Sequence, residues 1–196
     1  MKKQFAVTST LAGLLTALLF SGVALADLPK KKQTPQGLYL TAAESYDFVQ
    51  KNQKETVFID VRTRAEVDFL GMPSIADANI PYMLSGDWGQ WDEKKKTFKL
   101  APNSGFLPAV EKLLAAKGLG KESNIVLMCR SGSRSAKASK LLAEAGYSNV
   151  YTVVDGFEGD KAKEGPQKGQ RVVNGWKNAN LPWSYALDKE KMYWEM

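Results

Sequence analysis

The sequence contains no histidine and only one cysteine, Cys129, among its 196 residues. A single cysteine cannot form a disulfide within the chain, and without histidine no step of its chemistry can use an imidazole. The sequence also shows no ligand cluster with metal-binding spacing and no cofactor motif. We therefore expect a protein that works without a metal or a cofactor.

Long apolar runs are missing too, apart from Leu11 to Phe20. That run is shorter than the roughly 20 residues that a membrane span needs. Lys2 and Lys3 precede it, and the small-x-small sequence Ala24 to Ala26 follows it, which is the pattern of a secretory signal peptide. The sequence therefore predicts export, cleavage after Ala26 and no membrane attachment of the mature chain.

Cleavage would remove two lysines and no acidic residue, so the formal net charge would fall from +6 to +4. That balance suits small anions and gives no reason to expect nucleic-acid binding. In a Gram-negative organism the exported chain would be periplasmic, where an unpaired thiol is exposed to oxidation; keeping it favours a chemical use. We divide the chain into a signal peptide (1–26), a solvated leader (27–37), one domain (38–159) and an aromatic-rich C-terminal extension (160–196) that packs on the domain.

Helical and strand-like segments alternate from residue 38 onward. Thr41 with Glu44, and Thr63 with Glu66, have the spacing of a capping box at a helix start. Four helices are expected, over Thr41 to Gln50, Ala65 to Leu70, Phe106 to Lys117 and Ala136 to Ala145. Four strands are expected, over Thr56 to Asp60, Ile75 to Ile80, Asn124 to Met128 and Val150 to Val154. This alternation favours an α/β fold with a central, mainly parallel sheet and helices on both faces.

The single cysteine stands where a predicted strand meets a predicted helix. A polar loop begins there, with the residues Cys129, Arg130, Ser131, Gly132, Ser133, Arg134 and Ser135. Ligands of open α/β sheets bind outside the carboxyl ends of the strands. The helix N-terminus favours a bound anion and an ionised thiol. We expect Gly132 to allow close backbone approach and Ser135 to cap the helix.

The side chains of this loop suit an oxyanion held against a reactive sulfur. Arg130 and Arg134 carry permanent charges on planar groups that match a tetrahedral oxyanion, and the three serines add hydroxyl donors. The thiolate of Cys129 would be the nucleophile. The alternative is that the cysteine is only a small buried hydrophobic residue closing the strand. Two arginines, a glycine and a helix start within six residues favour the chemical role.

The loop from Cys129 to Ser135 resembles the active-site loop of single-domain rhodaneses, which are thiosulfate-type sulfurtransferases. Other segments that resemble the family are Val57 to Arg62, Glu66, Gly71, Ala78 to Pro81 and Val150 to Gly159. The resemblance covers Leu38 to Gly159. The family's usual Gly-His-Ile is replaced here by Gly71, Met72 and Pro73, so any role of that histidine is absent.

The resemblance implies a two-step transfer of a sulfane sulfur. The Cys129 thiolate would attack the outer sulfur of a small anionic donor such as thiosulfate, forming a persulfide and releasing sulfite. A thiol or protein-thiol acceptor would then take the sulfur. The loop N–H groups, Arg130 and Arg134 would stabilise the negative charge.

Two rival functions remain open. Phosphatases and arsenate reductases of the same fold have five residues between cysteine and arginine, whereas Cys129 and Arg134 enclose four. A non-catalytic rhodanese-like module would bind a partner or carry sulfur, although such modules often lack the cysteine. Sulfur transfer is the preferred interpretation.

Asp60 and Arg62 end a predicted strand at the same sheet edge, and both are candidate supporting residues. Asp60 could brace the loop through Arg134, while Arg62 and Glu66 could form an ion pair that only shapes the fold. The irregular segment from Met83 to Pro102 is either a lid over the site or a surface loop whose tryptophans, Trp88 and Trp91, pack on the domain.

Overall fold

The computed structural model describes residues 28–85 and 90–194. The predicted signal peptide and Trp88 lie outside the described residues. Within the described part of the chain, no helix has the length and apolar character that crossing a bilayer requires.

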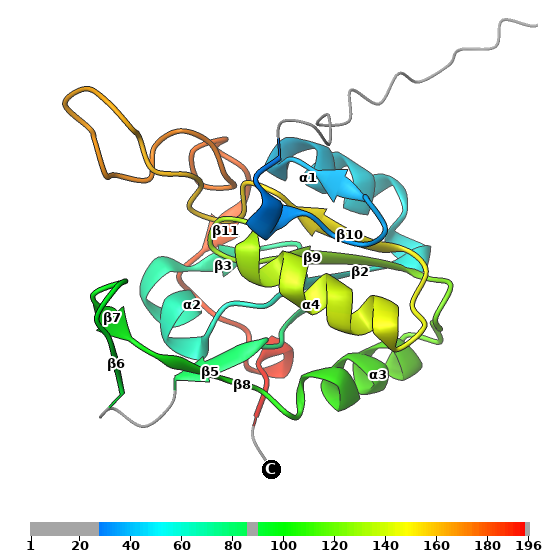
Figure 1. The fold of residues 1–196 in the computed structure, drawn as a ribbon. Coiled ribbons are helices and arrows are strands. Elements are labelled where there is room, and N and C mark those ends of the chain that lie inside the picture. Colours follow the sequence, from blue (N-terminus) through cyan, green and yellow to red (C-terminus); the bar gives the residue numbers. More distant parts are fainter. Residues whose placement is uncertain (1–27, 86–89, 195–196) are drawn as a thin grey trace, which may run out of the picture.

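A five-stranded parallel sheet forms the centre of the molecule (Figure 1). Its strands, in spatial order, are β1 (Tyr39–Leu40), β10 (Val150–Val153), β9 (Asn124–Met128), β2 (Thr56–Asp60) and β4 (Ala78–Asn79). Every neighbouring pair is parallel. All residues of β2 are buried, as its continuous apolar run predicts for a strand covered on both faces. The predicted α/β fold is confirmed.

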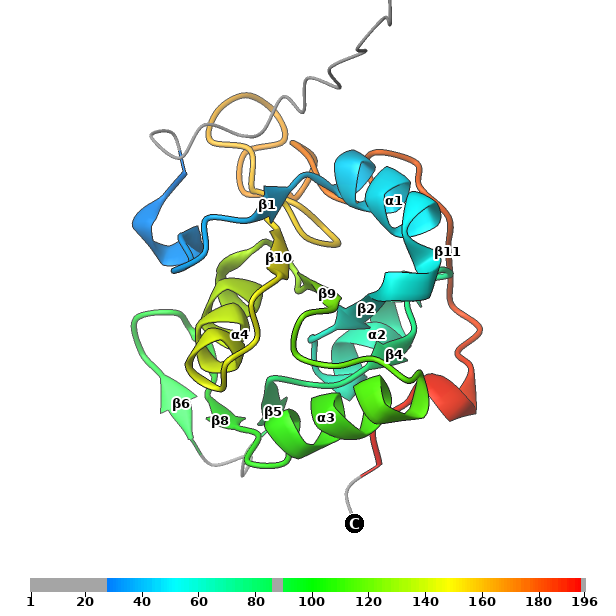
Figure 2. The ribbon, with the colours of Figure 1, turned by 90° about the vertical axis from the view of Figure 1, so that its right-hand side faces the viewer.

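Helices cover both faces of this sheet (Figure 2). They are α1 (Ala42–Lys51), α2 (Arg64–Leu70), α3 (Phe106–Ala116) and α4 (Ser133–Glu144). Residues of α3 and α4 share one buried apolar cluster, and residues of α1 and α2 share the other. Both predicted capping boxes form, with Thr41 as the N-cap of α1 and Thr63 as the N-cap of α2.

Shorter elements surround this core. The remaining strands are β3 (Met72–Pro73), β5 (Met83–Ser85), β6 (Trp91–Asp92), β7 (Thr97–Phe98), β8 (Leu100–Pro102) and β11 (Trp183–Ser184). Single 3₁₀ turns are η2 (Lys30–Lys32), η3 (Gln53–Glu55) and η4 (Lys189–Lys191).

Two predicted boundaries are wrong. The strand expected over Ile75 to Ile80 is only Ala78–Asn79, because only these two residues pair with the end of β2. The fourth helix begins at Ser133 rather than Ala136, because Gly132 already accepts a hydrogen bond from the Ala136 N–H. Ser135 therefore lies in the first turn and does not cap the helix; Gly132 is the N-cap residue.

The segment before the domain is not wholly solvated. Lys30 and Lys31 are exposed, but Lys32 is buried at the start of α4. Its ammonium group contacts both carboxylate oxygens of Asp160, at 2.8 and 2.9 Å. A buried lysine needs such a partner because the charged group loses its hydration, so this part of the leader belongs to the fold.

The C-terminal extension lies against the sheet and completes the core on the α1 and α2 face. Trp176 is fully buried, with its ring 5.4 Å from that of Phe58 and 6.0 Å from that of Tyr46, centroid to centroid. Further along, β11 pairs antiparallel with β3. The Tyr193 N–H donates to the carbonyl of Asn79 on the edge strand β4.

Residues 83–85 and 90–102 form a β arm, in which β5 pairs with β8 and β6 pairs with β7. Trp91 contacts Phe98 within this arm, with 5.3 Å between ring centroids, and remains 43% exposed. Trp91 therefore packs on Phe98 of its own arm.

We predict that Trp176→Ala lowers the free energy of unfolding by about 3–5 kcal/mol, because it leaves a large cavity in a closed core. Trp194→Ala, at a tryptophan that is 57% exposed, should change it by less than about 0.5 kcal/mol. Urea denaturation of both variants tests this. A loss for Trp176→Ala as small as that expected for Trp194→Ala would mean that the extension is not part of the folded core.

Candidate active site

The Cys129 sulfur lies at the carboxyl end of β9 and the N-terminus of α4. The backbone N–H of Gly132 donates to the sulfur at 3.2 Å. The Ser135 hydroxyl oxygen lies 3.7 Å from the sulfur and 3.0 Å from the Gly132 carbonyl oxygen. The residue is only 1% exposed. A donor N–H and a helix N-terminus directed at the sulfur both stabilise negative charge there.

The loop is held by close backbone contact with the segment that follows β10. The Phe157 N–H donates to the Cys129 carbonyl at 2.8 Å, and the Glu158 N–H donates to the Arg130 carbonyl at 3.0 Å. A β-carbon added to Gly132, which has φ +90°, would lie 2.2 Å from the carbonyl oxygen of Val154. Glycine is therefore required in this loop by both conformation and space.

Arg134 does not lie free to bind a donor. Its two terminal nitrogens each contact one carboxylate oxygen of Glu66, at 2.6 Å. Burial alone would raise the pKa of the Glu66 carboxyl, but hydrogen bonding and charge from Arg134, with hydrogen bonds from Thr63, lower the pKa from 4.5 to about 2. Burial would likewise lower the pKa of Arg134, but Glu66, then the charges of Cys129 and Asp60, raise it. This bidentate pair joins the first turns of α2 and α4.

Asp60 and Arg62 pair with each other, so the expected pairings of Asp60 with Arg134 and of Arg62 with Glu66 are wrong. Both side chains are fully buried, and the closest nitrogen–oxygen distance is 2.6 Å. Arg62 also donates to the Gly71 carbonyl at 2.7 Å and places its guanidinium 3.8 Å from the centroid of the Phe157 ring. Arg62 thereby supports Phe157, whose N–H holds the Cys129 carbonyl.

The other loop residues are more accessible. The side chain of Arg130 is 46% exposed, with its Nε 3.9 Å from the Glu158 carboxylate. Ser131 and Ser133 are partly exposed. Arg130 is therefore the loop arginine that can meet a donor.

One residue near the site gave no signal in the sequence. Arg171, from the C-terminal extension, donates a hydrogen bond to the Gly159 carbonyl. Burial and the charge of Arg130 lower the pKa of Arg171, while Glu158, Asp160 and Cys129 oppose that shift. Its charge thus acts on the same loop, although its position in the chain lies far from the motif.

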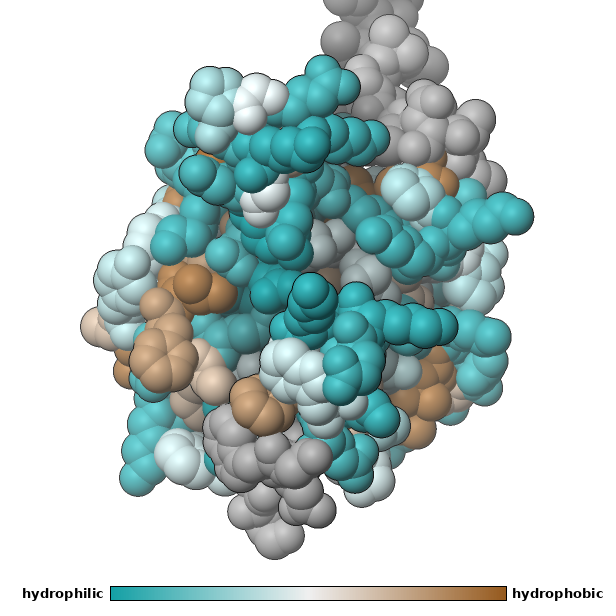
Figure 3. Space-filling model, turned by 60° about the vertical axis from the view of Figure 1, so that its left-hand side comes forward, coloured by the Kyte–Doolittle hydropathy of each residue, from teal (hydrophilic) through white to brown (hydrophobic). Residues whose placement is uncertain are grey.

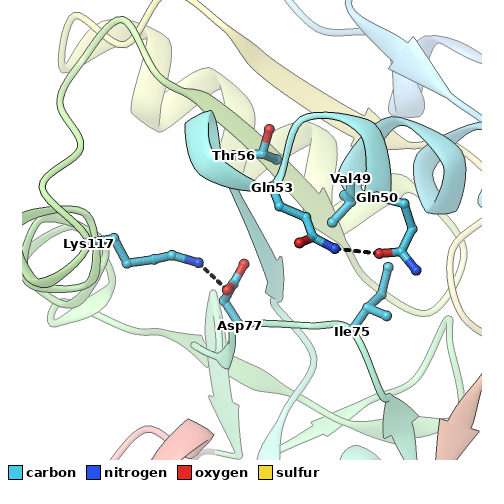
Figure 4. A pocket seen from close by; sticks show the side chains of 7 residues that line it. All are labelled: Val49, Gln50, Gln53, Thr56, Ile75, Asp77 and Lys117. Atoms are coloured by element: carbon cyan, nitrogen blue, oxygen red, sulfur yellow. Dashed lines mark hydrogen bonds and ion pairs between the residues drawn. The ribbon is translucent and has the colours of Figure 1, made fainter.

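No group of three or more potential ligand residues (His, Cys, Asp or Glu) that could hold a metal occurs in residues 28–85 and 90–194. A cavity of about 330 Å³ lies at the other end of the strands from the cysteine, where β2 begins at Thr56 (Figure 4). It is lined by Val49, Gln50, Gln53, Thr56, Ile75, Asp77 and Lys117. An ion pair joins Lys117 to Asp77 across it, and it contains no residue of the cysteine loop.

A buried β-strand, a cysteine loop and a following helix arranged in this way define a sulfur- or oxyanion-handling α/β domain. Residues 44–163 match the rhodanese-like domain family model, and the chain belongs to that family. The resemblance drawn from the loop is therefore confirmed.

Several known proteins are similar to this chain. The uncharacterized protein RC0915 of Rickettsia conorii is 31% identical over 146 residues, which are 74% of this chain and 96% of that protein. Thiosulfate sulfurtransferase 18 of Arabidopsis thaliana is 32% identical over 123 residues, 60% of this chain and 79% of that protein. The crystal structure of Rv0390 from M. tuberculosis superimposes with a TM-score of 0.55 at 25% identity and covers 76% of this chain and 97% of that one. The rhodanese-like domain and the thiosulfate sulfurtransferase relative support a sulfurtransferase-family enzyme.

We predict that Glu66→Gln destabilises the protein in a pH-dependent way. The folded pKa lies below the ordinary value, so the stabilisation is full above about pH 4.5 and is lost as the pH falls toward about 2. At neutral pH, the loss in the free energy of unfolding should be at most roughly 3 kcal/mol.

Urea unfolding at pH 7 and near pH 3 measures the effect. Glu44→Gln is the control, because Glu44 completes a capping box but has no arginine contact among the described residues. A difference between wild type and Glu66→Gln that stays constant with pH would contradict the assignment.

Gly132→Ala should destabilise the protein by more than the roughly 1–2 kcal/mol that a left-handed conformation costs an L-residue, because its methyl group would also overlap Val154. Gly165→Ala is the matched control, since Gly165 has φ +75° and nothing within 4 Å of an added β-carbon. Thermal or urea unfolding compares them. Equal losses would show that the close approach does not shape the loop.

Proposed function

We propose that this chain is a sulfurtransferase that moves a sulfane sulfur from thiosulfate or a similar donor to a thiol acceptor, through a persulfide on Cys129. The observation that carries the proposal is the hydrogen bond from the Gly132 N–H to the cysteine sulfur, at 3.2 Å. A backbone donor already aimed at the sulfur stabilises the attacking thiolate and the anionic persulfide without reorganisation.

The reaction balances in two displacements. The Cys129 thiolate attacks the outer sulfur of thiosulfate, a sulfur–sulfur bond forms, and the bonding pair of the original sulfur–sulfur bond leaves with sulfite. An acceptor thiolate then attacks the terminal sulfur of the persulfide and becomes a persulfide itself, while the Cys129 thiolate is restored. No external oxidant or reductant is needed. The name of the Arabidopsis relative, thiosulfate sulfurtransferase, supports this donor.

The two arginines of the loop have different roles. Arg134 is held by Glu66 and contributes its field and the position of the α4 first turn. Arg130 has no carboxylate closer than 3.9 Å in the described chain and is the loop side chain that meets the donor. Because Arg134 is already paired with Glu66, it is not available to bind a substrate as the loop arginine of a phosphatase does, and this weighs against a phosphatase.

The burial of Cys129 favours a second candidate function. With the residue 1% exposed, a donor reaches the sulfur only when the covering groups move. A module that binds a partner without turnover would need no such movement. The reaction with a donor therefore decides between the two.

We also propose that the chain is exported and acts in the periplasm. The signal-peptide pattern over residues 1–26 supports this location, as does the use of a single unpaired cysteine. The acceptor there would be a small thiol or a protein thiol.

Turnover with thiosulfate and cyanide tests the proposal. Thiocyanate formation should follow ping-pong kinetics, and Cys129→Ser should abolish it. Ser135→Ala should lower kcat/KM about tenfold, the size of one hydrogen bond. Ser139→Ala, at a buried serine farther along the same helix, is the control and should keep the wild-type rate.

Full activity of Cys129→Ser would contradict the persulfide mechanism. A wild-type protein that folds but transfers sulfur from thiosulfate neither to cyanide nor to a thiol acceptor would favour the binding module.

A further inference from the structure

Part of the C-terminal extension lies close to the cysteine loop. Gly159 donates its N–H to the carbonyl of Arg130 at 3.2 Å and accepts a hydrogen bond from the guanidinium of Arg171. Lys161 and Arg171 form an isolated antiparallel bridge, so the chain doubles back between them. In Figure 1 this segment, in orange, projects from the end of the sheet at which α4 begins.

Asn178 fixes the returning segment. Its side-chain nitrogen donates to the carbonyls of Glu158 and Arg171, both at 3.1 Å, and to that of Asn174 at 2.7 Å. One amide thus ties the segment after β10, which contacts the cysteine loop, to the chain around Arg171. The position of the Arg171 backbone is therefore set by the fold.

Among the described residues, Arg171 lacks the carboxylate partner that each of its neighbouring cations has. Asp160 is held by Lys32, and Glu158 lies 3.9 Å from Arg130. Arg171 has no carboxylate oxygen within 4 Å in the part of the chain that the structure describes, and its guanidinium donates only to the Gly159 carbonyl there.

Gly159 links the two arginines, because its N–H donates to the Arg130 carbonyl and its carbonyl accepts from the Arg171 guanidinium. Burial lowers the pKa of Arg171 first, and the charge of Arg130 lowers it further. An anion bound by both guanidinium groups would offset these like charges. Figure 3 shows the face that carries the extension loop and the arm, with hydrophilic residues over its centre and upper part.

We propose that Arg130 and Arg171 form a subsite for the anionic, non-reacting end of the sulfur donor, such as the sulfonate-type group of thiosulfate. Arg171 is then a specificity-determining residue supplied by the extension. It lies beyond residues 44–163, the part that matches the family model. The inference rests on the proposed function for the identity of its ligand.

Thiosulfate binding to the full mature chain carrying Cys129→Ser tests the subsite without any sulfur transfer. Isothermal titration at low salt should detect binding, and adding Arg171→Gln should raise the Kd about tenfold. Lys168→Gln, which removes one charge from an exposed residue of the same loop, is the matched control and should leave the Kd unchanged. Arg171→Lys, which keeps the charge but not the planar fork, should fall between them.

Equal affinity of the Arg171→Gln and parent proteins would overturn the subsite, and so would a lack of thiosulfate binding by the Cys129→Ser protein. Urea unfolding of Arg171→Gln checks that the fold is kept. Sulfur uptake by the protein with intact Cys129 is measured separately. Binding that depends on Arg171 without any sulfur uptake would leave the subsite standing and remove the proposed transfer.

Discussion

The close backbone contact between the cysteine loop and the segment after β10 is the constraint on which the site depends. Carbonyls of Cys129 and Arg130 accept N–H groups from residues 157–159, so the loop is fixed by peptide groups rather than by long side chains. Gly132 and Gly156 permit this approach, because a β-carbon on Gly156 would lie 2.5 Å from the Cys129 carbonyl oxygen. These contacts hold the loop in the conformation in which the Gly132 N–H points at the sulfur.

Two ion pairs stabilise the cysteine loop without using Arg130, which stays accessible to a ligand. The buried pair of Asp60 and Arg62 places a cation on the Phe157 ring, and the pair of Glu66 and Arg134 locks the first turns of two helices. Charges used in this way are unavailable to a substrate. The cations that remain near the sulfur are the partly exposed Arg130 and the extension's Arg171. In the proposed subsite, an arginine of the cysteine loop and an arginine of the extension together select the anion.

The parts of the fold that depend on local spacing were predictable from the sequence. Both capping boxes need only a threonine and a glutamate three residues apart, and the bounds of β2 and β9 follow from continuous apolar runs. The start of α4 was missed because its N-cap is Gly132, which has no side-chain cap that the sequence could show. The φ of +90° at Gly132 and its close approach to Val154, 22 positions away, are visible only in the fold.

The ion pairs of the site could not be predicted from the sequence either. Arg62 and Glu66 have the spacing of a helical pair, but Arg62 precedes the helix and turns back onto Asp60, while Glu66 faces Arg134, 68 positions away. The motif could identify Cys129 and its loop, since those residues are contiguous. It could not reveal which arginine stays accessible, or that Arg171 returns from the extension.

The central claim is that Cys129 carries a sulfur atom as a persulfide. Its most direct test is the intact mass of the purified mature protein before and after exposure to thiosulfate. The account predicts a gain of one sulfur atom that disappears on adding cyanide or a thiol and is absent in Cys129→Ser. An unchanged mass, in a folded protein whose cysteine is otherwise alkylated by iodoacetamide, would contradict it.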